Sequence, residues 1–249
     1  MTKNKNHRSV QSTNDSSIHS KLSMVNCGYI EDDNIKFFCT KRSRRSPLIN
    51  RGYYVRAKAI SSVLEAYCRS MKHDQCQVLS LGAGYDTTFF RLKAANTLPD
   101  QCRYYEVDLP QVVQHKCQVV AKSSHLTELA GSPTGTGTWT AYCILTQDLV
   151  KTNDLKVTLK KNGFDFDIPT LILAECVLSY LDVDGSDALI KWTADEFSNC
   201  ALAVYEQVYP TDSFGIVMLK HFTTLGSPLK SLYDFPDPSR FTLPRWGHL

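Results

Sequence analysis

The sequence has no apolar run that approaches the length of a membrane span, and its first residues, MTKNKNHRSV, lack the apolar core of a signal peptide. Its nine cysteines are scattered, with neither a CxxC pair nor the Cys/His spacing of a zinc site. These absences argue against a membrane protein, a disulfide scaffold and a structural zinc domain. We therefore expect a cytoplasmic protein with reduced cysteines and no bound metal.

Strong charge of one sign is also absent, because the net charge is only +3 over 249 residues. Any contact with nucleic acid should then come from a local patch, and the best candidate is the basic segment 41–45, KRSRR. Hydrophobic residues make up 43% of the chain and charged residues 21%, as in ordinary globular proteins. This length and composition predict one sizeable α/β domain with little left over for a second.

The segment 77–92, QVLSLGAGYDTTFFRL, predicts the first strand, turn and helix of a nucleotide-binding domain. The apolar run at 78–81 is typical of a buried parallel strand, and Gly82 and Gly84 follow where a backbone can approach a ligand closely. The third glycine of the dinucleotide fingerprint is replaced by Thr87. The turn therefore suits a nucleotide without phosphates, most commonly S-adenosylmethionine, although such a turn is often only a turn.

Asp108 stands at the end of the next predicted strand, 103–109, and lies 26 residues after Gly82 (108 − 82). A carboxylate at this point can accept hydrogen bonds from both hydroxyl groups of a ribose. The alternative is an ordinary strand-terminal acid at a turn before Pro110. The spacing favours the nucleotide-binding interpretation.

Two further segments, 139–149 and 169–181, each predict a strand that ends at an acid. These acids are Asp148 and Glu175, the latter in the carboxyl end 174–176 that follows the strand residues 171–173. Because a glutamate in so apolar a stretch is costly to bury without a partner, we expect Glu175 to be functional. The carboxyl ends of parallel strands meet at one edge of an open sheet. The glycine turn and the three acids should therefore form one ligand site.

Ahead of the first strand, the sequence predicts a disordered tail at 1–15, a short helix at 15–24 and a long amphipathic helix at 47–71. Lys21 in the short helix is by default a solvated lysine. Arg56, near the start of the long helix, would usually lie along the surface. In this position an arginine can instead reach the mouth of the cleft and bind a carboxylate through its planar fork.

Several longer segments resemble signatures of the leucine carboxyl methyltransferase family. They are NRGYYVR (50–56), LGAGYDTTFFRLK (81–93), YEVDLP (105–110), PTLILAECVLSYL (169–181) and YEQ (205–207) followed by DSFGIVML (212–219). The resemblance covers nearly all of 13–235. It implies a Rossmann-like S-adenosylmethionine-dependent methyltransferase fold with a mostly parallel sheet, occupying residues 16–235, and methyl transfer to a carboxylate.

The resemblance also implies a set of cofactor contacts, carried over residue by residue. S-adenosylmethionine would bind to Lys21, Arg56, Gly82, Asp108, Asp148, Leu149 and Glu175. In this set Arg56 holds the methionine carboxylate, Lys21 closes over it and Glu175 faces the methionine end. Asp108 holds the ribose and Asp148 the adenine amino group. No catalytic residue is implied, because a carboxylate acceptor is already ionised at pH 7.

Within the family, TNDSSIHSK (13–21), RRSPLINRGYYVRAKA (44–59) and HFTTLGSPL (221–229) look most like the branch that acts on tRNA. That branch implies, as partner, phenylalanine tRNA carrying a wybutosine precursor, whose side-chain carboxylate is methylated before its amino group is methoxycarbonylated. The alternative acceptor is the C-terminal leucine of the protein phosphatase 2A catalytic subunit.

The sequence departs from the family in two respects. The segment 236–249 does not continue the family pattern, and the kelch-type propeller that follows the domain in the tRNA branch is missing from this sequence. We therefore expect a truncated domain without its last C-terminal strands, ending in a divergent tail. A further alternative is an inactive module that retains the cofactor cleft.

Overall fold

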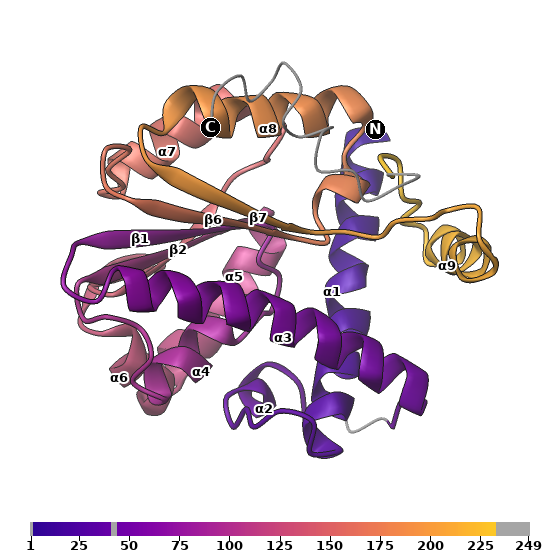
Figure 1. The fold of residues 1–249 in the computed structure, drawn as a ribbon, viewed down its shortest axis with the longest axis horizontal. Helices are drawn as coiled ribbons and strands as arrows, with labels where there is room; N and C mark the ends of the chain where they lie inside the picture. The colour runs from indigo at the N-terminus through magenta and orange to yellow at the C-terminus, as the bar shows by residue number, and fades with distance from the viewer. Residues whose placement is uncertain (1, 41–43, 233–249) are drawn as a thin grey trace.

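The computed structural model describes residues 2–40 and 44–232. A seven-stranded sheet with the strand order β3-β4-β5-β2-β1-β6-β7 lies at its centre (Figure 1). Five neighbouring strands are parallel, and two short strands add an antiparallel edge beside β5. This confirms the predicted α/β fold with a mostly parallel sheet. The strands are β1 (Cys76–Leu81), β2 (Cys102–Asp108), β3 (Pro133–Gly135), β4 (Thr138–Trp139), β5 (Tyr142–Thr146), β6 (Thr170–Glu175) and β7 (Cys200–Tyr205).

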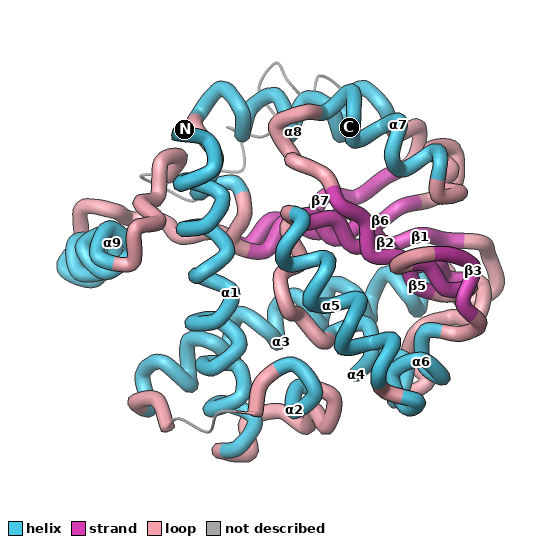
Figure 2. Tube along the Cα trace, turned by 180° about the vertical axis from the view of Figure 1, so that it is seen from behind, coloured by secondary structure: helices cyan, strands magenta, loops and turns pink. Residues whose placement is uncertain are grey.

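Helices cover both faces of the sheet (Figures 1 and 2). One face carries α7 (Thr152–Lys161) and α8 (Val183–Glu196). The opposite face carries α3 (Pro47–Ser70), α4 (Thr88–Ala94), α5 (Pro110–Lys122) and α6 (Ser124–Ala130). Helix α1 (Thr2–Asn26) stands across the carboxyl ends of the strands, and α9 (Ser213–Thr224) lies beyond it, away from the sheet. The short helices α2 (Ile35–Phe38) and η1 (Leu178–Tyr180) complete the described elements.

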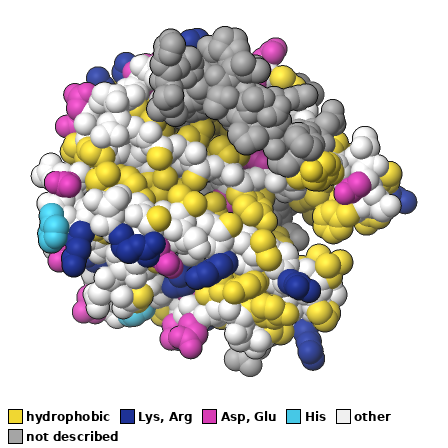
Figure 3. Space-filling model, in the orientation of Figure 1, with side chains coloured by type: hydrophobic (Ala, Val, Ile, Leu, Met, Phe, Trp, Pro, Cys, Tyr) yellow, Lys and Arg dark blue, Asp and Glu magenta, His cyan; other side chains and the backbone are white. Residues whose placement is uncertain are grey.

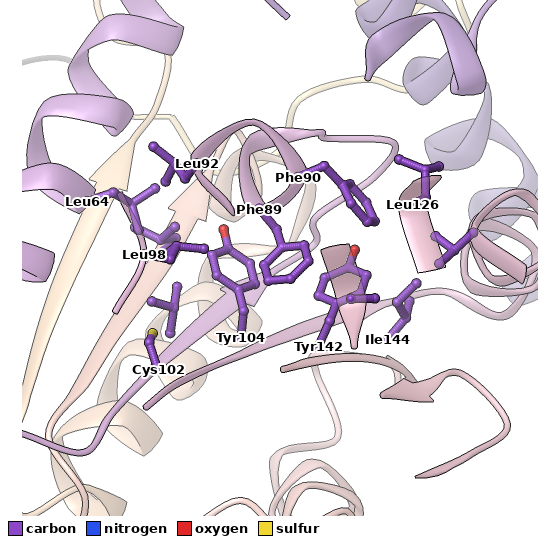
Figure 4. Close-up of a cluster of buried hydrophobic side chains, with 14 of the residues drawn as sticks. Leu64, Phe89, Phe90, Leu92, Leu98, Cys102, Tyr104, Leu126, Tyr142 and Ile144 are labelled. Atoms are coloured by element: carbon purple, nitrogen blue, oxygen red, sulfur yellow. The ribbon is translucent and has the colours of Figure 1, made fainter. Parts of the chain in front are cut away.

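Each face of the sheet buries its own hydrophobic core, because successive side chains along a strand point to opposite faces. Leu79 packs into the cluster beneath α7 and α8, whereas its neighbour Val78 belongs to the cluster on the opposite face. In that second cluster Figure 4 shows Phe89 of α4 between Tyr104 and Tyr142. The rings of Phe89 and Tyr142 stack with their centroids 4.2 Å apart. The two cores therefore fix the positions of the strand ends relative to one another.

A buried ion pair joins α5 to the sheet and to the glycine turn. The Lys116 ammonium group lies 2.5 Å from a Glu106 carboxylate oxygen, and each side chain is only 1% exposed. Lys116 also donates a hydrogen bond of 2.7 Å to the backbone carbonyl of Asp86. One cation therefore holds together β2, α5 and the loop that follows β1.

The N-terminal segment differs from its sequence-based description. Helix α1 begins at Thr2, so the segment predicted as a disordered tail at 1–15 is helical from its second residue onward. The range 2–26 contains no proline or glycine to interrupt a helix, and its later turns are anchored by the buried side chains of Ile18 and Leu22. The polar composition of residues 1–15 therefore did not predict that this segment is helical.

The predicted strand at 139–149 is also divided. It is formed by the end of β4 and all of β5, which pair antiparallel through Thr138 and Cys143. The chain turns between them, and Thr140 donates a hydrogen bond of 3.0 Å to the carbonyl of Ser132. By contrast, the long helix predicted at 47–71 is confirmed as α3, which Ser46 caps by accepting a hydrogen bond from Ile49.

At the other edge of the described part of the sheet, β7 pairs with β6 alone. The divergent tail predicted at 236–249 lies outside the described residues. Among the described helices, none combines the length and the apolar composition that crossing a membrane requires.

Candidate functional site

The turn after β1 needs glycine at two positions. Gly82 and Gly84 have φ angles of 60° and 56°, a left-handed conformation that side chains disfavour. A Cβ atom on Gly82 would lie 2.8 Å from a methyl carbon of Val177, and one on Gly84 would collide with the side chain of Asn14. In this structure the turn lies close to protein side chains, Val177 in the loop before η1 and Asn14 on α1. The close approach to a ligand stays a prediction.

Asp108, at the end of β2, braces this turn. Its two carboxylate oxygens accept hydrogen bonds of 2.7 Å from the backbone N–H groups of Gly84 and Leu109. Burial nevertheless raises the pKa of Asp108 above its usual value. Because each carboxylate oxygen has two lone pairs, both oxygens can still accept another hydrogen bond.

The loop after β5 lies directly against the end of β2, since Gln147 donates a hydrogen bond of 3.0 Å to the carbonyl of Asp108. Asp148 accepts a hydrogen bond of 3.3 Å from the N–H group of Val150. Leu149 is buried in the core beneath α7 and α8. The strand ends carrying Asp108 and Asp148 are therefore neighbours, as the sequence predicted.

Four charged side chains meet at the ends of β1 and β6, and we call them the charged cluster: Lys21, Arg56, Asp86 and Glu175. The Lys21 ammonium group lies 2.7 Å from Asp86 and 3.2 Å from Glu175. The Nε atom of Arg56 donates to the same oxygen of Glu175. Each of the four side chains is only 11–18% exposed. Two cations and two carboxylates thus alternate in a partly dehydrated, electrically neutral group.

The pairing determines the charge state of the cluster. Burial opposes the charge on Lys21, but Asp86 and then Glu175 keep its pKa above the usual value. Burial likewise opposes ionisation of Asp86, and Lys21 with Lys116 holds the pKa of that carboxyl well below its usual range. The pKa of Arg56 is raised because Glu175 outweighs the effect of burial. Lys21, Asp86 and Arg56 therefore stay ionised at neutral pH.

A cavity of about 830 Å³ opens over these strand ends. It is bounded by the glycine turn, α1, the first turns of α3, and α9. Of the seven residues implied as cofactor contacts, the structure brings four to the cavity wall: Lys21, Arg56, Gly82 and Glu175. The other three, Asp108, Asp148 and Leu149, lie at neighbouring strand ends and do not line it.

Sequence reasoning missed several residues of this cavity. One of them is Asp86, which accepts a hydrogen bond of 2.9 Å from the N–H of Thr88 at the start of α4 and also pairs with Lys21. An acid two residues after the GxG turn was the available signal. Tyr180, Tyr205 and Phe214 also line the cavity. Their positions depend on how η1, β7 and α9 pack, for which the sequence offered no local signal.

Asp86 should make the stability of the fold depend on acidity. Its folded-state pKa lies below the ordinary value of 3.8. Its stabilising contribution is therefore complete above that value and is lost as the pH falls through the lower, folded-state pKa. We expect Asp86→Asn to flatten the decline of the unfolding free energy between about pH 5 and about pH 2, measured by urea denaturation.

Asp100 offers the matched control for this prediction, because its side chain is 99% exposed and pairs with Lys93 at the surface. Asp100→Asn should leave the pH profile close to that of the unmodified chain. Identical profiles for Asp86→Asn and the unmodified chain would show that Asp86 gains nothing from its buried partners.

Comparison with known proteins gives concordant results. A model of the leucine carboxyl methyltransferase family matches residues 10–194. The chain is 41% identical over 239 residues to tRNA wybutosine-synthesizing protein 4 of Homo sapiens, an alignment that covers 92% of this chain and 35% of the relative. It is 37% identical over 237 residues to leucine carboxyl methyltransferase 1 homolog of Arabidopsis thaliana, covering 93% of this chain and 71% of the relative.

Among solved structures, a crystal structure from Thermobifida fusca YX superposes with a TM-score of 0.56 at 16% identity, covering 85% of this chain and 77% of that one. At this identity the likeness shows a shared fold. The chain spans about a third of the human relative's length but nearly three quarters of the Arabidopsis relative's. The family model covers more than half of the chain, over the same strands and turn that build the charged cluster. The chain therefore belongs to the leucine carboxyl methyltransferase family.

Proposed function

We propose that this chain is an S-adenosylmethionine-dependent carboxyl methyltransferase that acts in wybutosine biosynthesis on phenylalanine tRNA. The charged cluster is the observation that carries the cofactor part of the proposal. Its alternating cations and carboxylates are complementary to the amino-acid end of S-adenosylmethionine, which has both an ammonium group and a carboxylate. The relative named tRNA wybutosine-synthesizing protein 4 supports the choice of acceptor.

The residues present fit this cofactor in two ways. Arg56 and Lys21 would hold the methionine carboxylate, and Glu175, which both of them contact in this structure, would hold the ammonium group. At the adjacent strand end, Asp108 keeps free lone pairs that can accept from the ribose hydroxyls. We keep the seven implied contacts, including Asp148 and Leu149, as the proposed binding set.

Methyl transfer requires that the acceptor carboxylate and the methyl group are held in line, in a site from which water is excluded. When bound, S-adenosylmethionine supplies an electrophilic methyl group, and the acceptor carboxylate needs no general base because it is ionised at neutral pH. The paired side chains of the charged cluster hold their geometry before any ligand enters, so that little reorganisation is needed. Tyr180 and Tyr205, both partly buried, give the cavity an aromatic wall on this side.

A second candidate function is methylation of the C-terminal leucine of the protein phosphatase 2A catalytic subunit. It is favoured by the Arabidopsis relative named leucine carboxyl methyltransferase 1 homolog, of which the chain covers 71%. The same cofactor site would serve both reactions, since each acceptor presents a carboxylate. Only the acceptor distinguishes the two.

The test is to incubate the purified chain with S-adenosylmethionine labelled in its methyl group and with either acceptor. We expect base-labile label on phenylalanine tRNA that carries the wybutosine precursor, and none on the same tRNA without the modification. Label on the phosphatase peptide alone would replace the tRNA assignment by the second candidate. Cofactor binding by calorimetry without label on either acceptor would contradict both and indicate a binding module.

Asp108→Asn tests the ribose contact. The amide keeps the size of the side chain but can accept at only one of its two ends, so one charge-assisted hydrogen bond to the ribose is lost. We expect the dissociation constant of S-adenosylhomocysteine, measured by calorimetry, to rise about tenfold. The exposed Asp100→Asn variant serves as the control. Unchanged affinity in Asp108→Asn would mean that Asp108 does not contact the ribose and only stabilises the turn through Gly84 and Leu109.

A further inference from the structure

The cavity wall contains four cationic side chains, and they fall into two pairs. Lys21 and Arg56 are neutralised by the carboxylates of the charged cluster. Arg45 and Arg51, near the start of α3, form no ion pair within residues 13–40 and 44–232. The second pair therefore leaves two positive charges in the cavity wall without a protein counterion in that part of the chain.

The backbone of Arg45 is held by hydrogen bonds, although no described residue pairs with its side chain. Its backbone N–H donates to the hydroxyl of Ser23 at 2.8 Å, and its carbonyl accepts from the side-chain amide of Asn50 at 3.3 Å. Both supporting residues are buried. The Nε atom of Arg45 is itself buried and has no hydrogen-bond acceptor among the described residues. Because an arginine stays charged, the guanidinium group of Arg45 keeps a positive charge in the cavity wall that no described carboxylate pairs with.

The surroundings of these arginines are apolar. On α9 the side chains of Phe214 and Val217 are 62% and 67% exposed, and on α3 that of Leu48 is 67% exposed. All three line the same cavity as Arg45 and Arg51. Figure 3 shows hydrophobic side chains gathered on α9 and around the start of α3, on the side of the molecule where Figure 1 places both elements. The wall thus offers positive charge beside exposed hydrophobic surface.

We propose that Arg45 and Arg51 bind a backbone phosphate of the RNA acceptor, next to the nucleotide whose carboxylate is methylated in the charged part of the cavity. This inference rests on the proposed function. A guanidinium fork matches two phosphate oxygens, and exposed aromatic and aliphatic side chains suit an unstacked base. RNA supplies both groups in each nucleotide, which favours it over an acidic peptide.

The experiment measures binding of a fluorescent anticodon stem-loop RNA carrying the precursor at several salt concentrations. Each lost phosphate contact should reduce the slope of log K against log salt by about one unit. We expect Arg45→Gln and Arg51→Gln each to weaken binding and lower the slope. Lys58→Gln is the matched control, since Lys58 is exposed on the same helix and does not line the cavity. Affinity for S-adenosylhomocysteine should stay unchanged in all three variants, which separates the effect from misfolding.

Two results would overturn the phosphate site. If the unmodified chain methylates the tRNA and the slope is the same in Arg45→Gln, Arg51→Gln and Lys58→Gln, the phosphate site is wrong and the proposed function stands. The second result is that the unmodified chain binds no RNA and Arg45→Gln weakens binding of the phosphatase peptide. The arginines would then bind a peptide, and both the phosphate site and the tRNA assignment would be wrong.

Discussion

Replacing Lys116 by methionine should lower the free energy of unfolding by about 3–5 kcal/mol, because it leaves the Glu106 carboxylate buried without its partner. Both side chains are only 1% exposed. Burial already raises the pKa of Glu106 in spite of Lys116. The variant also loses the hydrogen bond from Lys116 to the carbonyl of Asp86, which fixes the loop after β1.

Urea denaturation of three variants separates this explanation from a general loss of packing. Lys122→Met, at an exposed position at the end of the same helix, should change stability by no more than about 0.5 kcal/mol. The double variant Lys116→Met/Glu106→Leu removes both charges and should recover most of the loss, since a buried ion pair can often be replaced by apolar residues. A double variant no more stable than Lys116→Met would contradict the uncompensated charge as the cause.

Arg56→Lys should weaken S-adenosylmethionine and S-adenosylhomocysteine by about tenfold to a hundredfold each, the range expected for a charge-assisted hydrogen bond of about 1.5–3 kcal/mol. Lysine keeps the positive charge but loses the planar fork that can hold a carboxylate with two parallel bonds. Adenosine lacks that carboxylate and should bind almost as before. The three affinities can be measured by calorimetry on each protein.

Arg69→Lys is the matched control, because Arg69 is exposed near the end of α3. It should change none of the three affinities. An equal loss for all three ligands in Arg56→Lys would mean that α3 had shifted, perturbing the whole cavity. Unchanged affinities would mean that Arg56 does not bind the ligand and only pairs with Glu175, its partner in this structure.

The parallel sheet could be predicted from the sequence because its strands are short apolar runs followed by turn residues. Val78 and Leu79 read as one such run, and each belongs to a core on its own face of the sheet. The edge at β4 and β5 was less predictable, since one apolar stretch there forms two strands with a turn between them. Local hydrophobicity does not show where such a stretch reverses.

From sequence pattern alone, the site residues could be predicted only where they directly follow a predicted strand. Glu175 could be found because a carboxylate in an apolar segment needs a partner. The partner itself could not be identified by pattern alone, since Lys21 lies on α1 and reaches the site through the packing of that helix. Its contact with Asp86 joins positions 65 residues apart. The wall provided by α9 depends in the same way on long-range packing.

The central claim is that the charged cluster and the neighbouring strand ends form the S-adenosylmethionine site, and the crystal structure of the chain with S-adenosylhomocysteine tests it most directly. We predict that the amino-acid carboxylate lies within hydrogen-bonding distance of Arg56, the ammonium group beside Glu175, and the ribose hydroxyls against Asp108. A ligand bound elsewhere, or one whose amino-acid end points away from Arg56 and Glu175, would contradict this account.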